Sequence, residues 1–382
     1  MTIYAMGSEN VFWDCYSEGN LDWDSATSQA YASAVSTASP FSSGGTGDDG
    51  YIRSTVSVRS SFDTDDYFVS DALGGLSEVW VHYNQALHTA NVGSSRILFM
   101  ACQSFTLGSS YSLNDAVAGV NESIVYYDGS SVQSDADTYD PYGDNGTQHW
   151  VDVHINLNAA SSENAIEWYV DEVLIDAVLG SEVSSSRLID YLFFSTNQTA
   201  TAPSHFSEIV AASFDTRGMR SISIPLDGAG NHTDWTGAYT DINDPSYDSS
   251  SYISTATAAD RASFTVGNVP SGVLEDKRIE ALAIGCLHQL SSGTSENAQL
   301  FVRIGGTDYD LGAFSVTTTL ARETTILSTS PATGITWSES EINSMEVGVK
   351  SESAGGTIRI FQLSAEAAIR PVTPAEVIIM HV

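Results

Sequence analysis

The feature that most constrains this fold is a pair of alternating segments between residues 148 and 178, QHWVDVHINLNAASSENAIEWYVDEVLIDAV. Apolar and polar residues take turns in both, and the apolar ones are Val151, Val153, Ile155 and Leu157, then Ile166, Trp168 and Val170. Alternation with a period of two places each apolar set on one side of a β-strand. The small polar residues between them, AASSEN, are typical of a hairpin loop. Such a hairpin must bury its apolar face, so we predict a second sheet stacked on it.

Further short segments with the pattern of strands recur along the chain, separated by turn residues, and residues 96–103 are continuously apolar, as in a strand buried on both faces. They are residues 51–59, 78–83, 96–103, 123–127, 187–196 and 205–214 in the first half, and 261–266, 278–287, 298–304, 313–319, 345–350 and 357–369 in the second. One helical turn is signalled, because Ser338 and Glu341 have the spacing of a capping box. Many short strands with so little helix signal predict an all-β protein of two antiparallel β-sandwich (jelly-roll) domains in tandem.

The domain boundary is expected near residue 225, where the sequence RGMRSISIPLDGAGNHTDWTG is punctuated by glycine and proline. We therefore assign residues 1–224 to the first sandwich and residues 225–370 to the second. The remaining residues 371–382, PVTPAEVIIMHV, contain two prolines and are apolar from Val377 to Met380. An apolar end of this kind is expected to dock on its own domain or to add a strand to a neighbour.

The central hairpin also carries a family resemblance. Residues 149–151 (HWV), a polar loop and residues 168–173 (WYVDEV) resemble the paired central strands of concanavalin A-like and laminin G-like jelly rolls. The resemblance covers roughly the first half of the chain and implies the same fold there. Glu172 stands where the family usually has glycine, so the turn after Asp171 is expected to differ.

The second half has a resemblance of its own, carried by five short segments. Residues 235–244 (WTGAYTDIND), 251–255 (SYIST), 262–266 (ASFTV), 302–309 (VRIGGTDY) and 345–350 (MEVGVK) resemble a β-domain that recurs in structural proteins of tailed bacteriophages. A lectin-like jelly roll often precedes this module in such proteins. The resemblance implies a component of the virion surface: a tail-fibre or tail-tip subunit, or a capsid decoration.

The charge balance excludes some partners. The chain has 48 Asp and Glu against 14 Lys and Arg, a formal net charge of −34, and its lysines are Lys277 and Lys350. Nucleic acids and anionic membranes require clustered cations, so neither is an expected partner. An acidic surface favours solubility and suits surroundings of high salt, where self-repulsion is screened.

The cysteines and the N-terminal residues indicate in which cellular compartment the protein is made. Cys15, Cys102 and Cys286 are too far apart for a metal site or an even-numbered disulfide framework, and the last two lie in apolar segments that suggest burial. No signal peptide is expected from the first residues, and no segment has the length of a membrane span. A serine-, threonine- and glycine-rich β-protein made without a secretion signal is consistent with assembly into a virus particle.

Two acidic clusters are candidate cation sites, because Ca²⁺ takes several oxygen ligands from flexible loops. The first is Asp135, Asp137, Asp140 and Asp144 with Asn145, and the second is Asp63, Asp65, Asp66 and Asp71. The first lacks the glutamate of an EF-hand, but the resemblance to lectin-like domains, which bind Ca²⁺ in rim loops, favours it somewhat. The alternative is a solvated acidic loop in a chain that is acidic throughout, and we assign no metal residue.

Carboxylates at Glu167, Asp171 and Glu172 raise the possibility of a glycosidase. Glu167 and Asp171 share a strand face but are roughly 13 Å apart along it, whereas retaining hydrolases need carboxylates about 5 Å apart. The histidines at 82, 149, 154, 205, 232 and 288 show no metalloprotease spacing, and the sequence has no nucleophile elbow or phosphate-binding loop. We assign no catalytic or cofactor-binding residue.

Aromatic residues make up 10% of the chain and admit two interpretations. Trp80 lies opposite Val79 and Val81 on its strand and, if exposed, could stack on a sugar ring. We favour a place in the core or in a subunit interface.

Taken together, these observations predict a non-catalytic virion subunit of a tailed phage, with roles in assembly and surface adhesion. We expect homo-oligomers, trimers above all, because virion appendages follow the symmetry of the particle. Two alternatives remain: a carbohydrate-binding adhesin that grips a host-surface glycan, and a polysaccharide hydrolase.

Overall fold

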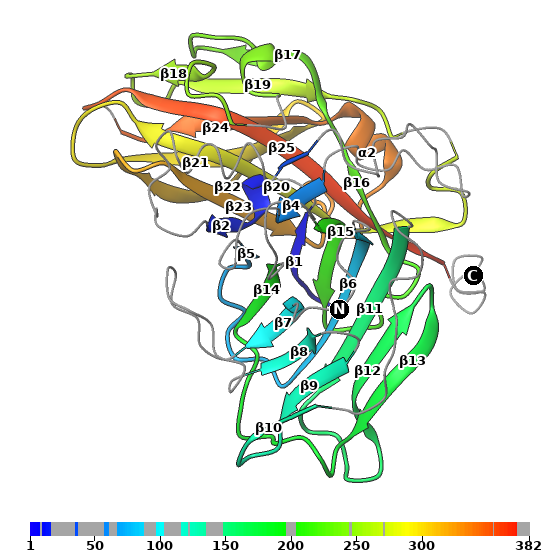
Figure 1. Ribbon diagram of the computed structural model, residues 1–382. Helices are drawn as coiled ribbons and strands as arrows, with labels where there is room; N and C mark the ends of the chain where they lie inside the picture. The colour runs from blue at the N-terminus through cyan, green and yellow to red at the C-terminus, as the bar shows by residue number, and fades with distance from the viewer. Residues whose placement is uncertain are drawn as a thin grey trace. The chain divides into compact units, whose positions relative to one another are not determined.

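The computed structural model describes residues 1–7, 10–16, 35–36, 57–60, 67–87, 97–102, 116–120, 123–134, 148–195, 204–243, 247–269, 272–353 and 355–372 (Figure 1). They form two compact units, one made mainly of residues up to Arg217 and the other mainly of residues from Gly218 onward. Each unit contains two antiparallel sheets, and helical residues are few. The all-β sandwich architecture predicted from the sequence is confirmed.

The first unit is built from a sheet that contains the predicted hairpin and a second sheet that faces it. The strand order in the first sheet is β13-β12-β11-β6-β15-β4-β3, with β1 also paired to β15, and in the second it is β10-β9-β8-β7-β14-β5-β2. The first sheet comprises β1 (Ile3–Gly7), β3 (Val35–Ser36), β4 (Ser57–Ser60), β6 (Glu78–Leu87), β11 (Gln148–Asn156), β12 (Asn164–Val170), β13 (Val173–Leu179) and β15 (Ser204–Ala212). The second comprises β2 (Asp14–Tyr16), β5 (Tyr67–Val69), β7 (Ile97–Cys102), β8 (Ala116–Val120), β9 (Ser123–Tyr127), β10 (Val132–Ser134) and β14 (Tyr191–Ser195).

The core of the first unit lies between these sheets. The apolar faces of β6, β11 and β12 are buried, as the alternation predicts, through Val79, Val81, Tyr83, Val151, Val153, Ile155, Ile166, Trp168 and Val170. Phe194 of the facing sheet has its ring centroid 5.4 Å from that of Tyr83 and 5.4 Å from that of Phe206. Burying each such side chain fully is worth about 1.5–3 kcal/mol, so this contact between the sheets stabilises the unit.

The turn between β12 and β13 keeps a tight geometry without glycine. Asp171 and Glu172 have φ angles of 49° and 66°, so both residues are left-handed, as a two-residue type I′ hairpin requires. The Asp171 carboxylate accepts a hydrogen bond from the Trp150 backbone N–H (3.0 Å), and the Asp171 N–H donates to the Trp150 carbonyl (2.8 Å). These bonds to β11 hold the turn in place of the missing glycine.

The second unit is also a sandwich. One sheet has the order β16-β25-β20-β23, with β18 paired to β25, and the other has the order β17-β19-β24-β21-β22. The strands of the first are β16 (Arg220–Ser223), β18 (Ile253–Thr255), β20 (Lys277–Leu290), β23 (Ala321–Leu327) and β25 (Ile358–Pro371). Those of the second are β17 (Leu226–Thr233), β19 (Arg261–Val266), β21 (Glu296–Ile304), β22 (Thr307–Val316) and β24 (Glu346–Ser351).

One hydrophobic core fills the space between these two sheets. Strands of both contribute, for example Leu282 and Ile284 of β20 and Val347 and Val349 of β24, and Cys286 is fully buried among them. Among the described residues, short 3₁₀ turns at Asn10–Phe12 in the first unit and Tyr239–Asp241 in the second accompany the strands.

The predicted helical turn is α2 (Glu339–Ser344) in the second unit. Ser338 accepts a hydrogen bond from the Glu341 N–H, and the Glu341 carboxylate accepts one from the Ser338 N–H (2.9 Å). These two bonds form the capping box that the sequence predicts. Of the described helices, none has the length and apolar character needed to cross a membrane.

The division between the units differs from the expected boundary at residue 224. Strand β16 pairs with β25, from Arg220 opposite Ile369 to Ser223 opposite Glu366, so it belongs to a sheet of the second unit. Glycine and proline mark where a chain turns, not which sheet the intervening strand joins. Here Gly218, with a φ of 75°, precedes β16 and Pro225 follows it. Of the apolar end predicted from 371 onward, residues 371–372 are described and Pro371 is the last residue of β25. Residues 377–380 lie outside the described residues.

Candidate functional site

Trp80 lies on the outer face of the first unit's sheet, where the sequence places it, and is 9% exposed. The ring of His154, on neighbouring β11, stacks on it with 4.2 Å between centroids. The Arg217 guanidinium lies 5.4 Å from the Trp80 ring centroid and 4.5 Å from that of Tyr169. Because its surroundings are filled by these side chains, Trp80 is part of a packed cluster, and little of it is left for a sugar ring.

Glu167 serves this cluster as a partner of His154. The Nδ1 atom of His154 lies 2.9 Å from Glu167 Oε2, and its Nε2 atom lies 3.0 Å from Glu78 Oε1. Burial opposes ionisation of Glu167, but hydrogen bonds from Asn164 and His154 hold the pKa of its carboxyl below the ordinary value. Asp171 is engaged in the β12–β13 turn. Glu167 and Asp171, two of the three carboxylates considered for a glycosidase, therefore have separate structural partners.

A buried polar group lies on the same face. His82 Nδ1 is 2.9 Å from Asp152 Oδ1, and the Thr216 hydroxyl donates to the same oxygen (2.8 Å). All three residues are fully buried. The side of the hairpin opposite its apolar face is thus covered at Asp152.

Most residues of the two acidic clusters considered as cation sites are not among the described residues. Asp135, Asp137, Asp140 and Asp144, and likewise Asp63, Asp65 and Asp66, lie outside the described residues. Asp71 is described and exposed. Within the described ranges, no three histidine, cysteine, aspartate or glutamate side chains are placed to hold a metal ion.

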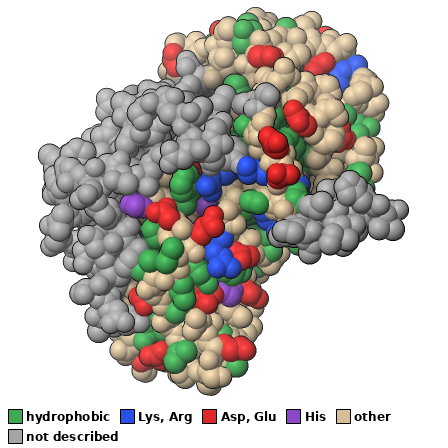
Figure 2. All heavy atoms as spheres, turned by 90° about the vertical axis from the view of Figure 1, so that its right-hand side faces the viewer, with side chains coloured by type: hydrophobic (Ala, Val, Ile, Leu, Met, Phe, Trp, Pro, Cys, Tyr) green, Lys and Arg blue, Asp and Glu red, His purple; other side chains and the backbone are tan. Residues whose placement is uncertain are grey.

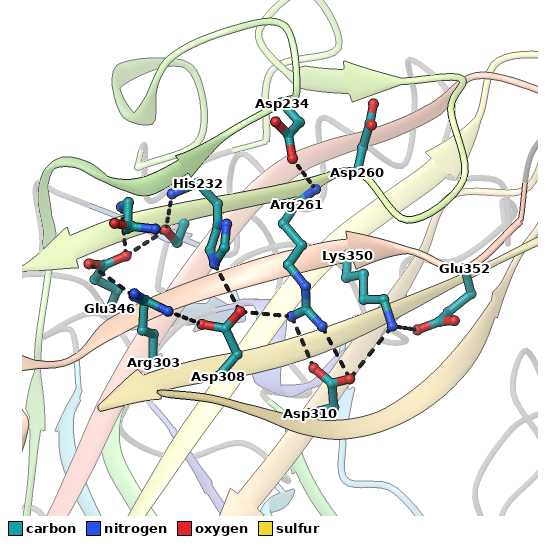
Figure 3. A network of polar contacts seen from close by, with 12 residues as sticks. His232, Asp234, Asp260, Arg261, Arg303, Asp308, Asp310, Glu346, Lys350 and Glu352 are labelled. Carbon is teal, nitrogen blue, oxygen red and sulfur yellow. Dashed lines mark hydrogen bonds and ion pairs between the residues drawn. The ribbon is translucent and has the colours of Figure 1, made fainter. Parts of the chain in front are cut away.

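The most organised polar surface is in the second unit. It covers the outer face of the sheet β17-β19-β24-β21-β22 and carries three of the chain's 14 basic residues, Arg261, Arg303 and Lys350. We call it the charged face, and Figure 3 shows its side chains pointing toward one another from the five strands and the segments beside them. Its members are His232, Arg261, Arg303, Asp308, Asp310, Glu346, Lys350 and Glu352.

Asp308, on β22, joins one half of the charged face. Its carboxylate lies 2.9 Å from His232 Nε2 and accepts a hydrogen bond from Arg303 Nη1 at 2.6 Å. Arg261 Nη1 approaches the same group at 3.6 Å. Burial works against the charged form, yet the hydrogen bond from Arg303 and the nearby cations hold the pKa of Asp308 below its ordinary value. Asp308 is therefore a fixed anion surrounded by donors.

Asp310 joins the other half. Arg261 donates to both of its oxygens, from Nη1 at 3.0 Å and from Nη2 at 3.3 Å, which is the paired geometry that suits a guanidinium and a carboxylate. Lys350 Nζ lies 3.6 Å from Asp310 and 2.6 Å from Glu352. The row of alternating basic and acidic side chains thus runs without a break from His232 to Glu352.

A buried aromatic ring lies beneath the charges. Phe301, on β21, is fully buried, with the Arg261 guanidinium 4.8 Å above its ring and His232 in an edge contact at 5.8 Å. Glycine is required at position 348 of neighbouring β24, because a Cβ there would meet the Ala262 carbonyl oxygen at 2.4 Å and Phe301 Cζ at 2.5 Å. The ring holds the stems of the cationic side chains and limits their motion.

Sequence reasoning did not find the charged face. The available signal was weak: Glu346 and Lys350 lie on one side of the strand segment 346–350 (EVGVK), opposite Val347 and Val349, which marks an outward strand face. The missing information was strand order, since β24 lies between β19 and β21 although it follows both in the chain.

Comparison with known proteins yields only distant likenesses. No family model matches the chain, and no curated protein does. Among solved structures, the receptor-binding domain of a botulinum neurotoxin C/D mosaic serotype aligns over 81% of this chain and 72% of its own, at 8% identity and a TM-score of 0.37. The ligand-binding domain of botulinum neurotoxin serotype D, in complex with N-acetylneuraminic acid, aligns over 86% and 96%, at 9% identity and a TM-score of 0.35. The cellulose-induced protein Cip1 aligns over 42% and 81%, at 12% identity and a TM-score of 0.31. Likenesses at this level do not carry a function from one protein to another.

Proposed function

We propose that this protein is a non-catalytic, adhesin-like binding protein and that the charged face of its second unit recognises carbohydrate. The observation that carries the proposal is the ordered array of donors and acceptors that His232, Arg261, Arg303, Asp308 and Asp310 present on one sheet. Sugar hydroxyls both donate and accept hydrogen bonds, so they can be bound by carboxylates and guanidinium groups placed side by side.

The array is held in place before any ligand arrives. Asp308 and Asp310 each contact two or more basic groups, and Arg261 and Arg303 are only 18% and 19% exposed. Side chains that are already ordered lose little conformational entropy on binding, and that loss is about 0.5–1.5 kcal/mol for each free side chain. A rigid polar surface of this kind favours a ligand rich in hydrogen-bonding groups.

The overall charge favours an uncharged ligand. The chain carries a formal net charge of −34, and Figure 2 shows acidic side chains spread widely over the face that it draws. The basic residues of the charged face are all paired with carboxylates. An anionic glycan would meet long-range repulsion and no free cation within this face, so we propose a neutral saccharide.

A glycan array with the full-length chain tests the proposal, and the affinity of any bound saccharide is then measured for Asp310→Asn. Loss of the Asp310 charge releases Arg261 and Lys350, and we expect affinity at least tenfold weaker, about 1.4 kcal/mol. Glu275→Gln is the matched control, because it makes the same change of charge at an exposed position outside the charged face. Absence of any glycan binding at low and high salt, or equal losses in both variants, would overturn the proposal.

We also propose that the protein acts on the surface of a tailed-phage virion as a homo-oligomer, with a trimer preferred. The support is the sequence resemblance carried by residues 235–244, 251–255, 262–266, 302–309 and 345–350. Mass spectrometry of purified particles and light scattering of the free protein test this placement. A stable monomer that is missing from particles would refute it and leave the carbohydrate proposal standing.

A further inference from the structure

A second group of side chains, on the opposite sheet of the second unit, has the composition of a sugar-binding subsite. Strand β18 pairs with β25, with Ile253 opposite Ile360 and Ser254 opposite Arg359. Ile358 and Ile360 of β25 belong to the core, so Arg359 points to the outer side of the sheet. The segment 247–252, which precedes β18, supplies the other members of the group.

Aromatic rings form the base of this group. The ring centroids of Tyr247 and Tyr252 lie 5.3 Å and 5.6 Å from that of Phe361, and both pairs have edge-on geometry. The Arg359 guanidinium lies 4.4 Å from the Tyr252 centroid. Phe361 is 2% exposed, whereas both tyrosines keep part of their surface accessible. The buried phenylalanine therefore fixes two tyrosines at the surface.

Polar groups surround the rings. The Nε atom of Arg359 is enclosed and has no hydrogen-bond partner in the part of the chain that the structure describes. Asp248 lies beside Tyr247, and hydrogen bonds from Ser250 hold the pKa of its carboxyl below the ordinary value. Burial, with Asp248 nearby, raises the pKa of the Tyr247 phenol, so this hydroxyl remains a donor.

We propose that Tyr247, Tyr252 and Arg359 bind a neutral pyranose as a second subsite, distinct from the charged face. The aromatic surface receives the C–H face of the sugar ring, and the tyrosine hydroxyls, the arginine and Asp248 bond its hydroxyls. The class of ligand in this assignment rests on the proposed carbohydrate-binding function. The site itself is made of residues that do not belong to the charged face.

Saturation-transfer NMR with the methyl glycosides of glucose, galactose and mannose tests the subsite in the full-length protein. Tyr247→Ala removes a ring and should weaken binding of the preferred glycoside at least tenfold. Tyr247→Phe keeps the ring and removes only the hydroxyl, so its loss should be smaller, about two- to fivefold. Thermal unfolding of each variant shows whether the fold is retained, and Tyr247→Phe keeps the test valid if the alanine variant unfolds.

The Asp310→Asn variant separates this inference from the proposed function. Glycoside binding that survives Asp310→Asn and is weakened in the Tyr247 variants, more by Tyr247→Ala than by Tyr247→Phe, supports the second subsite. If Asp310→Asn abolishes binding while both Tyr247 variants bind normally, the second subsite is refuted and the charged face stands. If none of the glycosides binds at millimolar concentration, the subsite is refuted for these sugars, and the glycan array then decides the proposed function.

Discussion

Acid should destabilise the second unit through one buried histidine, His288 on β20. The side chain is 2% exposed and packs on Phe314 with 4.7 Å between ring centroids. Burial lowers the pKa of His288 to about 4, although a hydrogen bond with the backbone of Arg322 partly opposes the shift. Its Nδ1 atom has no hydrogen-bond partner among the described residues. The imidazole is therefore neutral in the folded protein over most of the accessible pH range.

The size of the effect follows from the difference between the folded and unfolded states. An unfolded histidine takes up a proton as pH falls through about 6.5, whereas the folded one does so only near pH 4. Above pH 6.5 His288 is neutral in both the folded and the unfolded state, so it does not change the free energy of unfolding with pH. As pH falls from 6.5 to 4, the unfolded state binds more protons and stability is lost at about 1.4 kcal/mol per pH unit. Over the whole window the free energy of unfolding should fall by about 3 kcal/mol because of His288.

Substitution of His288 by leucine isolates this contribution. Urea unfolding at pH 7, 6, 5 and 4, followed by hydrogen exchange of peptides from β20, gives the stability of the second unit, and peptides from β11 report on the first. We expect the wild type to lose about 3 kcal/mol more than His288→Leu between pH 7 and pH 4. The acidic residues contribute equally to both proteins and cancel. Equal losses in the two proteins would show that His288 is not held neutral by burial.

Three further substitutions test local features by thermal or chemical unfolding. Glu172→Gly should stabilise the first unit by about 1 kcal/mol, because glycine adopts the left-handed conformation without strain; a destabilised variant would contradict the turn geometry. Gly348→Ala should cost the second unit about 2 kcal/mol or more, since its Cβ collides with Phe301 and with backbone; an unchanged melting temperature would contradict the close packing. Ser338→Ala should cost about 1 kcal/mol by removing the capping bond to Glu341; a neutral result would refute that cap.

The strands and the local caps could be predicted because their determinants are close in sequence. Alternation along residues 148–170 specifies which side of β11 and β12 is apolar, and a period of two leaves no freedom in that choice. Ser338 and Glu341 are three residues apart, so their reciprocal hydrogen bonds depend on little else. The apolar surroundings of Cys286 in sequence likewise predicted its burial, which the structure confirms.

The residues that cover the outer side of β6 and β11 could not be predicted in the same way. Alternation placed Trp80 and Asp152 on the outer side of their strands, but it cannot say what lies against that side. Arg217 and Thr216, far along the chain, cover them, and a surface expected to be wet is buried at Asp152.

The sequence by itself determined that this chain is all-β, that it forms two stacked-sheet units and where most of its strands lie, because alternation and turn chemistry act within a few residues. Only the tertiary structure decided which strands are neighbours, and with that the two candidate binding surfaces. Asp308 meets His232, and Arg359 meets Tyr252, because strand order brings distant segments together. The pairing of non-sequential strands depends on the packing of a whole core, which no local pattern encodes.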